Sequence, residues 1–368
     1  MGPLKMRFID EFRNKNIIKR VAQRITEIMP ENKISIMEVC GTHTQSFHRF
    51  GLDRLIPENL RLIAGPGCPV CVSDQDYIDK AIQLSKIADT IILSFGDMLR
   101  VPGTNTSLER QRAEGSDVRV VYSAWDSLKI AERNPKKKVI FLAVGFETTA
   151  PTLALTLQAA QKEKLNNLFF FSALKLIPPA MEALVFDRKL KIDGFLCPGH
   201  VSTIIGSQAY EIISKKYKIA CCVTGFEPLD ILEGIYLLLY QIIQNKPCVK
   251  NQYVRVVKRQ GNQKAKTIIN KVFKIYNATW RGLGQIPKSG LKLRDEFSSF
   301  DIDKIMHLNI KHKTSKIKQK RCRCGEVLKG IIQPPGCPLF RKVCHPGNPY
   351  GPCMVSSEGA CNAYYRYK

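Results

Sequence analysis

Residues 34–44 read ISIMEVCGTHT, and this stretch shows the organisation of the fold in its smallest form. Its first six residues are mostly apolar, as expected of a strand buried on both faces of a parallel sheet. A loop with a thiol and an imidazole, Cys40 and His43, comes directly after it. Ligands of open parallel sheets bind beyond the carboxyl ends of the strands, so this loop is a candidate functional site.

The same pattern of an apolar run followed by an amphipathic stretch recurs along the chain. A first helix is predicted over 8–29, where apolar residues recur at helical spacing and Pro30 follows. Strands are predicted at 34–39, 60–64, 90–95, 118–122, 139–144, 168–171, 194–196 and 219–223, with helices between them at 74–88, 152–162, 204–215 and 229–244. Alternating strands and helices predict parallel sheets with helices packed on both faces.

Eight strands are too many for one small α/β unit, so the predicted fold class is two Rossmann- or thioredoxin-like α/β units facing a cleft. A short internal repeat supports two units, because Gly-Phe-Glu follows a strand-like run at both 145–147 and 225–227. We expect domains over 1–135 and 136–250. Beyond Lys250 the alternation stops, and 251–368 is predicted to be a basic connecting segment followed by a small irregular module organised by metal.

The composition is that of a globular protein of two or three domains. Hydrophobic residues make up 44% and charged residues 24% of the 368 residues, which argues against disorder. No stretch approaches the roughly 18 apolar residues that a membrane span needs, and the first residues show no apolar segment of a signal peptide. We therefore expect a cytoplasmic protein with no membrane association.

The net charge of +25 raises the question of an acidic partner. Nine basic residues and no acidic one occur in 250–281, and six more basic residues occur in 311–321. Such runs are found in nucleic-acid binders, but also on solvated faces. The sequence lacks a helix-turn-helix pattern, zinc-finger spacing and a basic motif interleaved with aromatic residues, so we expect no nucleic-acid binding.

Thirteen cysteines in a cytosolic protein point to metal or redox chemistry rather than to structural disulfides. Cys68-Pro-Val-Cys71 follows a predicted strand and opens a helix, where a helix N-terminus favours thiolate. This spacing suits a redox pair or a pair of soft-metal ligands. Cys40 and His43 suit iron, zinc or copper, or nucleophilic chemistry. In both loops a small buried side chain is the alternative interpretation.

Weaker candidates lie in the other loops that follow predicted strands. Glu147 and Glu227 are explained equally well as helix caps, and His200 as a loop histidine that satisfies backbone groups. The predicted residues lining the cleft are Thr42, Gly145, Glu147, His200 and Glu227.

The tail carries six cysteines in its last 47 residues, with the spacing C-x-C-x12-C-x6-C-x8-C-x7-C. Structural zinc sites usually offer paired C-x2-4-C knuckles, which are missing here. Thiolate ligands among Pro and Gly turns fit an iron–sulfur cluster better, with zinc or disulfides as the alternative. A four-iron cluster needs four ligands, and the spacing does not say which four.

Several of these stretches resemble the motifs of one family in the same order. They are MEVCGTHT (37–44), GPGCPVC (65–71), SFGDMLRVPG (94–103), VGFETTAPT (144–152), PGHVSTIIG (198–206), GFEPLDIL (225–232), WRGLGQIPKSGLKLR (280–294), CRCGEVLKG (322–330), GCPLF (336–340) and PYGPCMVSSEGACNAYYRY (349–367). The sequence resembles the HypD family, hydrogenase maturation proteins that help to build the iron–dicyano–carbonyl group of nickel–iron hydrogenases.

The resemblance implies a scaffold and redox maturation factor rather than a conventional turnover enzyme. It implies a HypC-type chaperone that shares the iron of the Fe(CN)2CO intermediate, and a transient HypE-type cyanide donor. Cys40 would ligate the iron with His43 nearby, and Cys68 and Cys71 would form a thiol/disulfide pair and offer further iron ligands. Cys322, Cys337, Cys344 and Cys361 would hold a [4Fe–4S] cluster, leaving Cys324 and Cys353 as a redox pair. A stand-alone thiol–disulfide oxidoreductase is the alternative function, and a basic zinc-containing nucleic-acid binder ranks below it.

Overall fold

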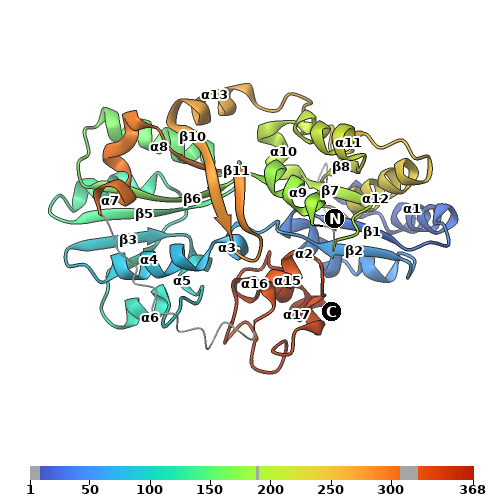
Figure 1. The fold of residues 1–368 in the computed structure, drawn as a ribbon, viewed down its shortest axis with the longest axis horizontal. Helices are drawn as coiled ribbons and strands as arrows, with labels where there is room; N and C mark the ends of the chain where they lie inside the picture. The colour runs from blue at the N-terminus through green and yellow to red at the C-terminus, as the bar shows by residue number, and fades with distance from the viewer. Residues whose placement is uncertain (1–8, 188–189, 307–321) are drawn as a thin grey trace, which may run out of the picture.

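A computed structural model of the chain describes residues 9–187, 190–306 and 322–368. The predicted start of the first helix at residue 8 and the basic run 311–321 lie outside these residues. Two sheets stand side by side, and the cysteine-rich tail packs below them (Figure 1).

The first sheet is parallel throughout, in the order β2-β1-β7-β8-β9. Its strands are β1 (Ile34–Glu38), β2 (Leu60–Ala64), β7 (Gly194–Pro198), β8 (Ala220–Thr224) and β9 (Val249–Asn251). Apolar side chains of α1 (Lys15–Ile28), α2 (Gly41–Arg49) and α12 (Pro228–Ile243) cover the face that carries Ile36. On the other face, Met37 and Phe195 pack with α9 (Ile177–Phe186), with α11 (Glu211–Tyr217) and with the tail.

The second sheet has the order β10-β11-β6-β5-β3-β4. Four of its strands are parallel, namely β3 (Thr90–Ser94), β4 (Val118–Val120), β5 (Lys138–Gly145) and β6 (Leu168–Lys175). One face is covered by α4 (Gln75–Ser85), and the other by α7 (Asp126–Arg133), α8 (Ala150–Lys162) and α13 (Gln263–Val272).

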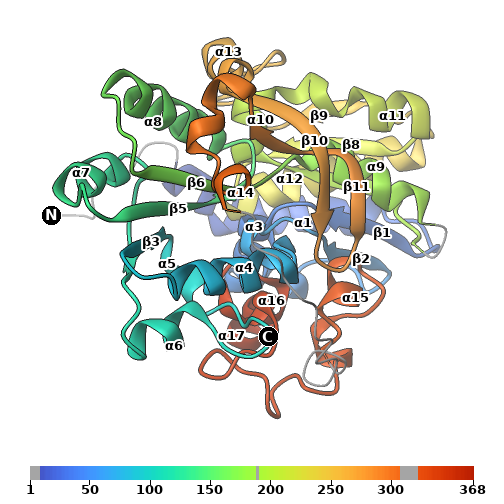
Figure 2. The same cartoon turned by 60° about the vertical axis from the view of Figure 1, so that its left-hand side comes forward.

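The hairpin β10 (Phe273–Trp280) and β11 (Gly284–Leu293) adds two antiparallel strands to the second sheet through β6. It runs from that sheet towards the tail, where its turn lies beside α3 (Pro69–Val72), as both views show (Figures 1 and 2). The buried Nζ of Lys175 donates to the carbonyl oxygen of Thr279 at 2.7 Å, and the Trp280 ring stacks on Phe146 with centroids 6.0 Å apart. These contacts fix the hairpin to the ends of β6 and β5.

The remaining elements are short. They are the helices α5 (Gly96–Leu99), α6 (Leu108–Ala113), α10 (Gly199–Ile205), α14 (Ile302–Ile305), α15 (Cys324–Leu328), α16 (Pro352–Val355) and α17 (Ala360–Tyr367), with 3-10 turns at Asp10–Arg13, Leu52–Arg54, Ser207–Tyr210, Asp295–Phe300 and Pro334–Gly336. The tail 322–368 is therefore small and irregular, and it packs through α17 on α2 and through α16 on α3.

All eight predicted strands are present, and the prediction of two α/β sheets is confirmed. Four details differ from expectation. The helix expected over 8–29 is interrupted at Asn14, whose extended backbone separates the 3-10 turn Asp10–Arg13 from α1 and whose side chain caps α1. The single helix expected at 204–215 is broken at Gly206, whose φ of 84° lies in the left-handed region. The alternation does not stop at Lys250, because α13 and the hairpin follow it. The second sheet is mixed rather than parallel.

The strands are also not divided between the sheets at residue 135. The chain leaves the first sheet after β2, builds four strands of the second sheet, and returns to the first sheet at β7. The two Gly-Phe-Glu loops still fall in different sheets, after β5 and after β8. No helix in the described parts of the chain has both the length and the apolar character needed to cross a membrane.

The anchoring of the hairpin gives a first prediction. Trp280 is 1% exposed, and its Nε1 donates to Ser289 Oγ at 2.9 Å. Replacing Trp280 with Ala removes the stack on Phe146 and leaves a cavity, which costs about 3–5 kcal/mol at such sites. We expect a clear fall in the thermal melting temperature. Ile275→Ala is the matched control, because Ile275 lies on the same hairpin and is 60% exposed; an equal fall in both variants would contradict this account.

Candidate metal and redox site

Cys40 ends the connection from β1 and is the N-cap residue of α2. Its side chain is buried, 7% exposed. The N–H of Gly41 donates to the carbonyl oxygen of Gly67 at 3.0 Å. A Cβ on Gly67 would lie 2.2 Å from the backbone N of Cys40, so only glycine allows this approach. The structure therefore brings the two predicted loops, after β1 and after β2, into backbone contact.

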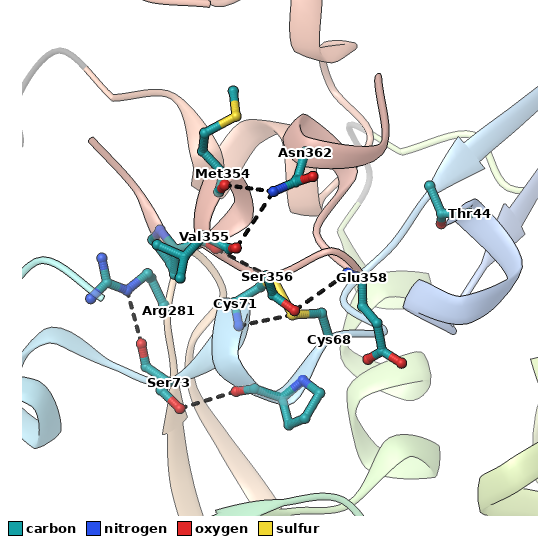
Figure 3. Close-up of a disulfide and its surroundings, with 12 residues drawn as sticks. Thr44, Cys68, Cys71, Ser73, Arg281, Met354, Val355, Ser356, Glu358 and Asn362 are labelled. Carbon is teal, nitrogen blue, oxygen red and sulfur yellow. Dashed lines mark hydrogen bonds between the residues drawn. A yellow bond between two sulfur atoms is a disulfide. The ribbon is translucent and has the colours of Figure 1, made fainter. Parts of the chain in front are cut away.

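Cys68 and Cys71 form a disulfide at the start of α3. Both are buried, at 3% and 0% exposure, and the N–H of Cys71 donates to Cys68 Sγ at 3.2 Å. Helix α3 packs on α16, where Cys71 Sγ lies 3.9 Å from the carbonyl oxygen of Pro352. Figure 3 shows this disulfide with Val355, Ser356 and Glu358 of the tail next to it. The C-x-x-C pair thus lies between the Cys40 loop and the tail.

The surroundings of Cys40 keep its thiol protonated. Burial raises its pKa to about 12, and the negative charge of Glu358 adds to this effect. The Glu358 carboxylate accepts a hydrogen bond from Thr42 Oγ1 at 2.8 Å, so Thr42 connects the loop to the tail. The helix N-terminus favours thiolate, but here desolvation outweighs it.

His43 is fully buried, on α2 under the end of β8. Its Nε2 lies 2.9 Å from the carbonyl oxygen of Gly225 and 3.0 Å from Thr224 Oγ1. Its Nδ1 has no hydrogen-bond partner among the described residues. Burial lowers the pKa of His43 to about 4, so the ring is neutral near pH 7. A neutral ring that donates Nε2–H to Gly225 has a free electron pair at Nδ1.

The ring of His43 also packs against Phe226 of the second Gly-Phe-Glu loop, with centroids 4.9 Å apart. Phe226 also packs against the ring of His200, with centroids 4.1 Å apart. His200 is exposed to solvent. The loops after β1, β7 and β8 thus meet at the carboxyl edge of the first sheet, as the sequence predicts for open parallel sheets.

The other predicted cleft residues have different environments. Glu227 is the N-cap of α12, in a capping box with Asp230, and it pairs with Arg13. Gly145 ends β5 in the second sheet. Glu147 is 4% exposed and accepts a hydrogen bond from the N–H of Ile177 at 3.0 Å, and burial raises its pKa to about 7. Glu227 caps α12, the helix that follows it, whereas Glu147 accepts from the first N–H of α9 and not from α8, the helix that follows it.

The six tail cysteines line one pocket. Cys322, Cys324, Cys337, Cys344, Cys353 and Cys361 share it with the apolar side chains of Val327, Leu339, Phe340 and Met354. A Cβ on Gly351 would lie 2.8 Å from Cys322 Sγ and 3.5 Å from Cys324 Sγ, and the thiols of Cys322 and Cys353 both affect the pKa of Cys324. The N–H of Tyr350 donates to Cys344 Sγ at 3.4 Å. A pocket of thiols with apolar walls and an N–H donor to sulfur fits the donor set of an iron–sulfur cluster.

Within the described ranges, no group of three or more Cys, His, Asp or Glu side chains is close enough to hold a single metal ion.

Sequence reasoning missed several residues of this site. Glu38 is buried at the end of β1, and its carboxyl accepts a hydrogen bond from Thr44 Oγ1 at 2.7 Å; burial raises its pKa to about 8. Glu358, Trp280 and Arg281 reach the site from distant segments. Glu38 could have been noticed as an acid inside an apolar run, whereas no local signal places the other three.

The chain matches known proteins along most of its length. The family model described as HypD, "Hydrogenase formation hypA family", matches residues 16–368. A hydrogenase maturation factor HypD of Cupriavidus necator is 41% identical, with 98% of this chain and 97% of that protein covered. The HypD of Escherichia coli is 42% identical, with 99% and 98% covered.

An archaeal relative extends this likeness. A putative hydrogenase expression/formation protein of Methanocaldococcus jannaschii is 42% identical, with 96% of this chain and 98% of that protein covered. Among solved structures, a conserved domain protein of Vibrio cholerae matches with 10% identity over 74% of this chain, 99% of that chain and a TM-score of 0.14, which is too low to inform the fold.

The close approach at Gly67 gives a prediction about this site. In Gly67→Ala the added methyl group collides with backbone atoms of Cys40, which cannot move without breaking the contact between the two loops. We expect a loss of stability at or above the upper end of the roughly 1–3 kcal/mol typical of overpacking, seen as a lowered melting temperature. Gly96→Ala is the control, because its nearest neighbour would be 3.8 Å away. If Gly67→Ala melts like this control, the two loops are not in contact.

The buried imidazole gives a pH dependence. The unfolded chain takes up a proton at His43 near pH 6.5, whereas the folded chain does so only near pH 4. As the pH falls from 6.5 to 4, the contribution of His43 therefore lowers the free energy of unfolding by up to roughly 3 kcal/mol. Thermal melts of wild type and His43→Gln over this range should show a smaller loss in the variant. Parallel curves would mean that the pKa of His43 is the same in the folded and the unfolded chain.

Proposed function

Because the chain belongs to the HypD family of hydrogenase maturation factors, we propose that it is the scaffold on which the Fe(CN)2CO group of [NiFe] hydrogenases is assembled together with a HypC-type chaperone. One observation supports this proposal most strongly. The buried Cys40 loop, the Cys68–Cys71 disulfide and the six-cysteine pocket lie in consecutive contact across three separate chain segments.

The iron is the cargo, and Cys40 is its first ligand in this proposal. A thiol with a pKa of about 12 stays protonated until a metal ion displaces the proton, so loading releases a proton. His43 offers the free pair of Nδ1 as a further ligand or accepts a proton there. Cys68 and Cys71 offer two more sulfur atoms once their disulfide is reduced. The disulfide form of Cys68 and Cys71 would therefore offer no sulfur ligand to the iron, whereas the reduced form would offer two.

The tail pocket fits a [4Fe–4S] cluster, which would be held by Cys322, Cys337, Cys344 and Cys361 and would supply one-electron redox chemistry when bound. Cys324 and Cys353 remain as the second thiol pair. This division follows the resemblance to the HypD family. The apolar walls restrict water, which protects sulfur ligands from exchange.

The proposed partners are the HypC-type chaperone, which completes the coordination of the iron, and a transient HypE-type cyanide donor, both in the cytosol. Nucleic acid is not proposed as a partner. Part of the basic stretch 250–281 is used within the chain, because Arg255 pairs with Asp230, Arg259 with Glu211 and Lys274 with Asp295. The exposed Lys250, Lys258, Lys264 and Lys271 suit an acidic protein surface.

A thiol–disulfide oxidoreductase is the second candidate, favoured by the disulfide itself. Cys68 and Cys71 are 3% and 0% exposed, however, so the disulfide of a substrate protein cannot reach their sulfur atoms in line, as exchange requires. Turnover of generic disulfide substrates by the protein alone would favour this candidate over the scaffold.

Infrared spectroscopy tests the scaffold directly. The protein co-purified without oxygen with its HypC-type partner should show the triple-bond stretching bands of cyanide and carbonyl. Cys40→Ala should lose these bands while keeping the visible absorbance of the tail cluster. Cys222→Ala is the matched control, since Cys222 is equally buried in β8 but packs within the core. Bands that persist in Cys40→Ala would contradict the assignment of the iron ligand.

The division of the tail cysteines is tested by its visible absorbance and by acid-labile sulfide. Cys337→Ala should lose both, because a cluster ligand is missing. Cys324→Ala should keep both, because its thiol belongs to the second pair. The reverse result would show that the cluster uses Cys324.

A further inference from the structure

A turn of the tail lies directly against the two residues that follow Cys40. A Cβ on Gly41 would lie 2.4 Å from the carbonyl oxygen of Glu358 and 2.6 Å from its Cβ. Thr42 Oγ1 donates to Glu358 Oε1 at 2.8 Å. Cys40 itself is 7% exposed, so a metal ion and a partner protein can share its sulfur atom only if its surroundings move.

Of the two segments packed on the Cys40 loop, the tail is the one that can separate from it. The loop of Gly67 is joined to it by a backbone hydrogen bond, from the N–H of Gly41, and follows β2, which pairs with β1 in the same sheet. The turn at Glu358 belongs to no strand of that sheet and is held there through a side chain. Movement of the tail therefore leaves the sheet intact.

The turn is part of a unit that is held together internally. Residues 356–359 join α16 to α17, and the N–H of Glu358 donates to Ser356 Oγ at 3.3 Å. The buried Nδ2 of Asn362 on α17 donates to the carbonyl oxygen of Met354 on α16 at 2.8 Å. Figure 3 shows both bonds next to the disulfide. We call this unit, residues 352–367, the lid.

The lid meets α2 at both ends of that helix. At the far end the ring of His48 packs edge-on against Tyr364, with centroids 4.4 Å apart. At the Cys40 end the contact is the Thr42–Glu358 hydrogen bond, whose acceptor is a carboxylate. Hydrogen bonds to ionised groups are stronger than those between neutral groups, so this bond contributes more than an ordinary one to holding the lid on α2.

We propose that the lid is a gate to Cys40 and that the Thr42–Glu358 hydrogen bond is the latch that keeps it shut. When the latch breaks, α17 and the turn separate from α2, which exposes the sulfur atom of Cys40. The other side of the lid stays attached, because α16 packs on α3 and Arg100 Nη2 donates to the carbonyl oxygen of Val355 at 3.2 Å. This inference rests on the proposed role of Cys40 as the iron ligand and adds regulation of access to it.

Opening of the lid is a local opening of the folded protein, with a free energy of its own below that of global unfolding. A reagent that reaches Cys40 only in the open form reacts at a rate set by the population of that form, when reclosing is faster than the reaction. The loss of one hydrogen bond to a charged group changes such a population about tenfold. Breaking the latch should therefore accelerate the reaction at Cys40 and leave the cysteines of the core unaffected.

The test is alkylation of the full-length protein, purified without oxygen and without its HypC-type partner, by iodoacetamide at fixed pH. Mass spectrometry of the tryptic peptide 34–49 reports on Cys40 alone, because it is the only cysteine in that peptide. We expect Thr42→Val to react about tenfold faster than wild type, and Glu358→Ala to match it, because each removes one partner of the same bond. Glu358→Gln keeps an oxygen acceptor and should stay within about threefold of wild type.

Thr26→Val is the matched control, because Thr26 Oγ1 donates to the carbonyl oxygen of Ala22 within α1 at 3.2 Å. It should react like wild type. The peptide that carries Cys221 and Cys222, both 0% exposed, reports global unfolding in the same samples.

An unchanged rate at Cys40 in Thr42→Val and Glu358→Ala would overturn the latch. An equal acceleration at Cys40 and at Cys222 would overturn the gate, because the variants would then act by unfolding the whole protein. A selective acceleration at Cys40, together with infrared bands that persist in Cys40→Ala, would support the gate and overturn only the proposed iron ligand.

Discussion

The contact between the loop of Gly67 and the backbone of Cys40 is the constraint on which the rest of the site depends. It brings the end of β1 and the start of α3 closer than two side chains would allow, so the thiol and the disulfide become neighbours. Because α3 is fixed there, α16 packs on it, and this contact places the cysteine pocket of the tail beside the disulfide. A tail of this size has little core of its own, so packing on α2 and α3 and ligation of a cluster would both contribute to its fold.

Burial decides the chemistry of these sulfur atoms. Away from water, the thiol of Cys40 is protonated and the ring of His43 is neutral, as the directions of their pKa shifts show. In the proposed scaffold a metal ion would replace the missing charge, so a pocket unfavourable for a free thiolate would suit a metal thiolate. The same argument would apply to the tail, where several thiols share apolar walls.

Much of the fold could be predicted from the sequence, because each strand is an apolar run bounded by turn residues. The hairpin 273–293 was missed since its strands carry Lys, Pro and Gly and are buried by tertiary packing rather than by their own pattern. The assignment of strands to sheets was also beyond reach, because the return of the chain at β7 leaves no local mark. In the site, the Cys40 and Cys68–Cys71 loops were predicted to lie together and do so. Glu358 and Arg281 reach them only through the packing of distant segments.

The account is tested most directly by anomalous diffraction at the iron absorption edge from crystals of the protein purified without oxygen. It predicts a strong iron peak inside the pocket of the six tail cysteines, and a second, separate peak beside Cys40 when the protein is loaded with its HypC-type partner. A zinc signal in the tail pocket, or a loaded complex without iron beside Cys40, would contradict it.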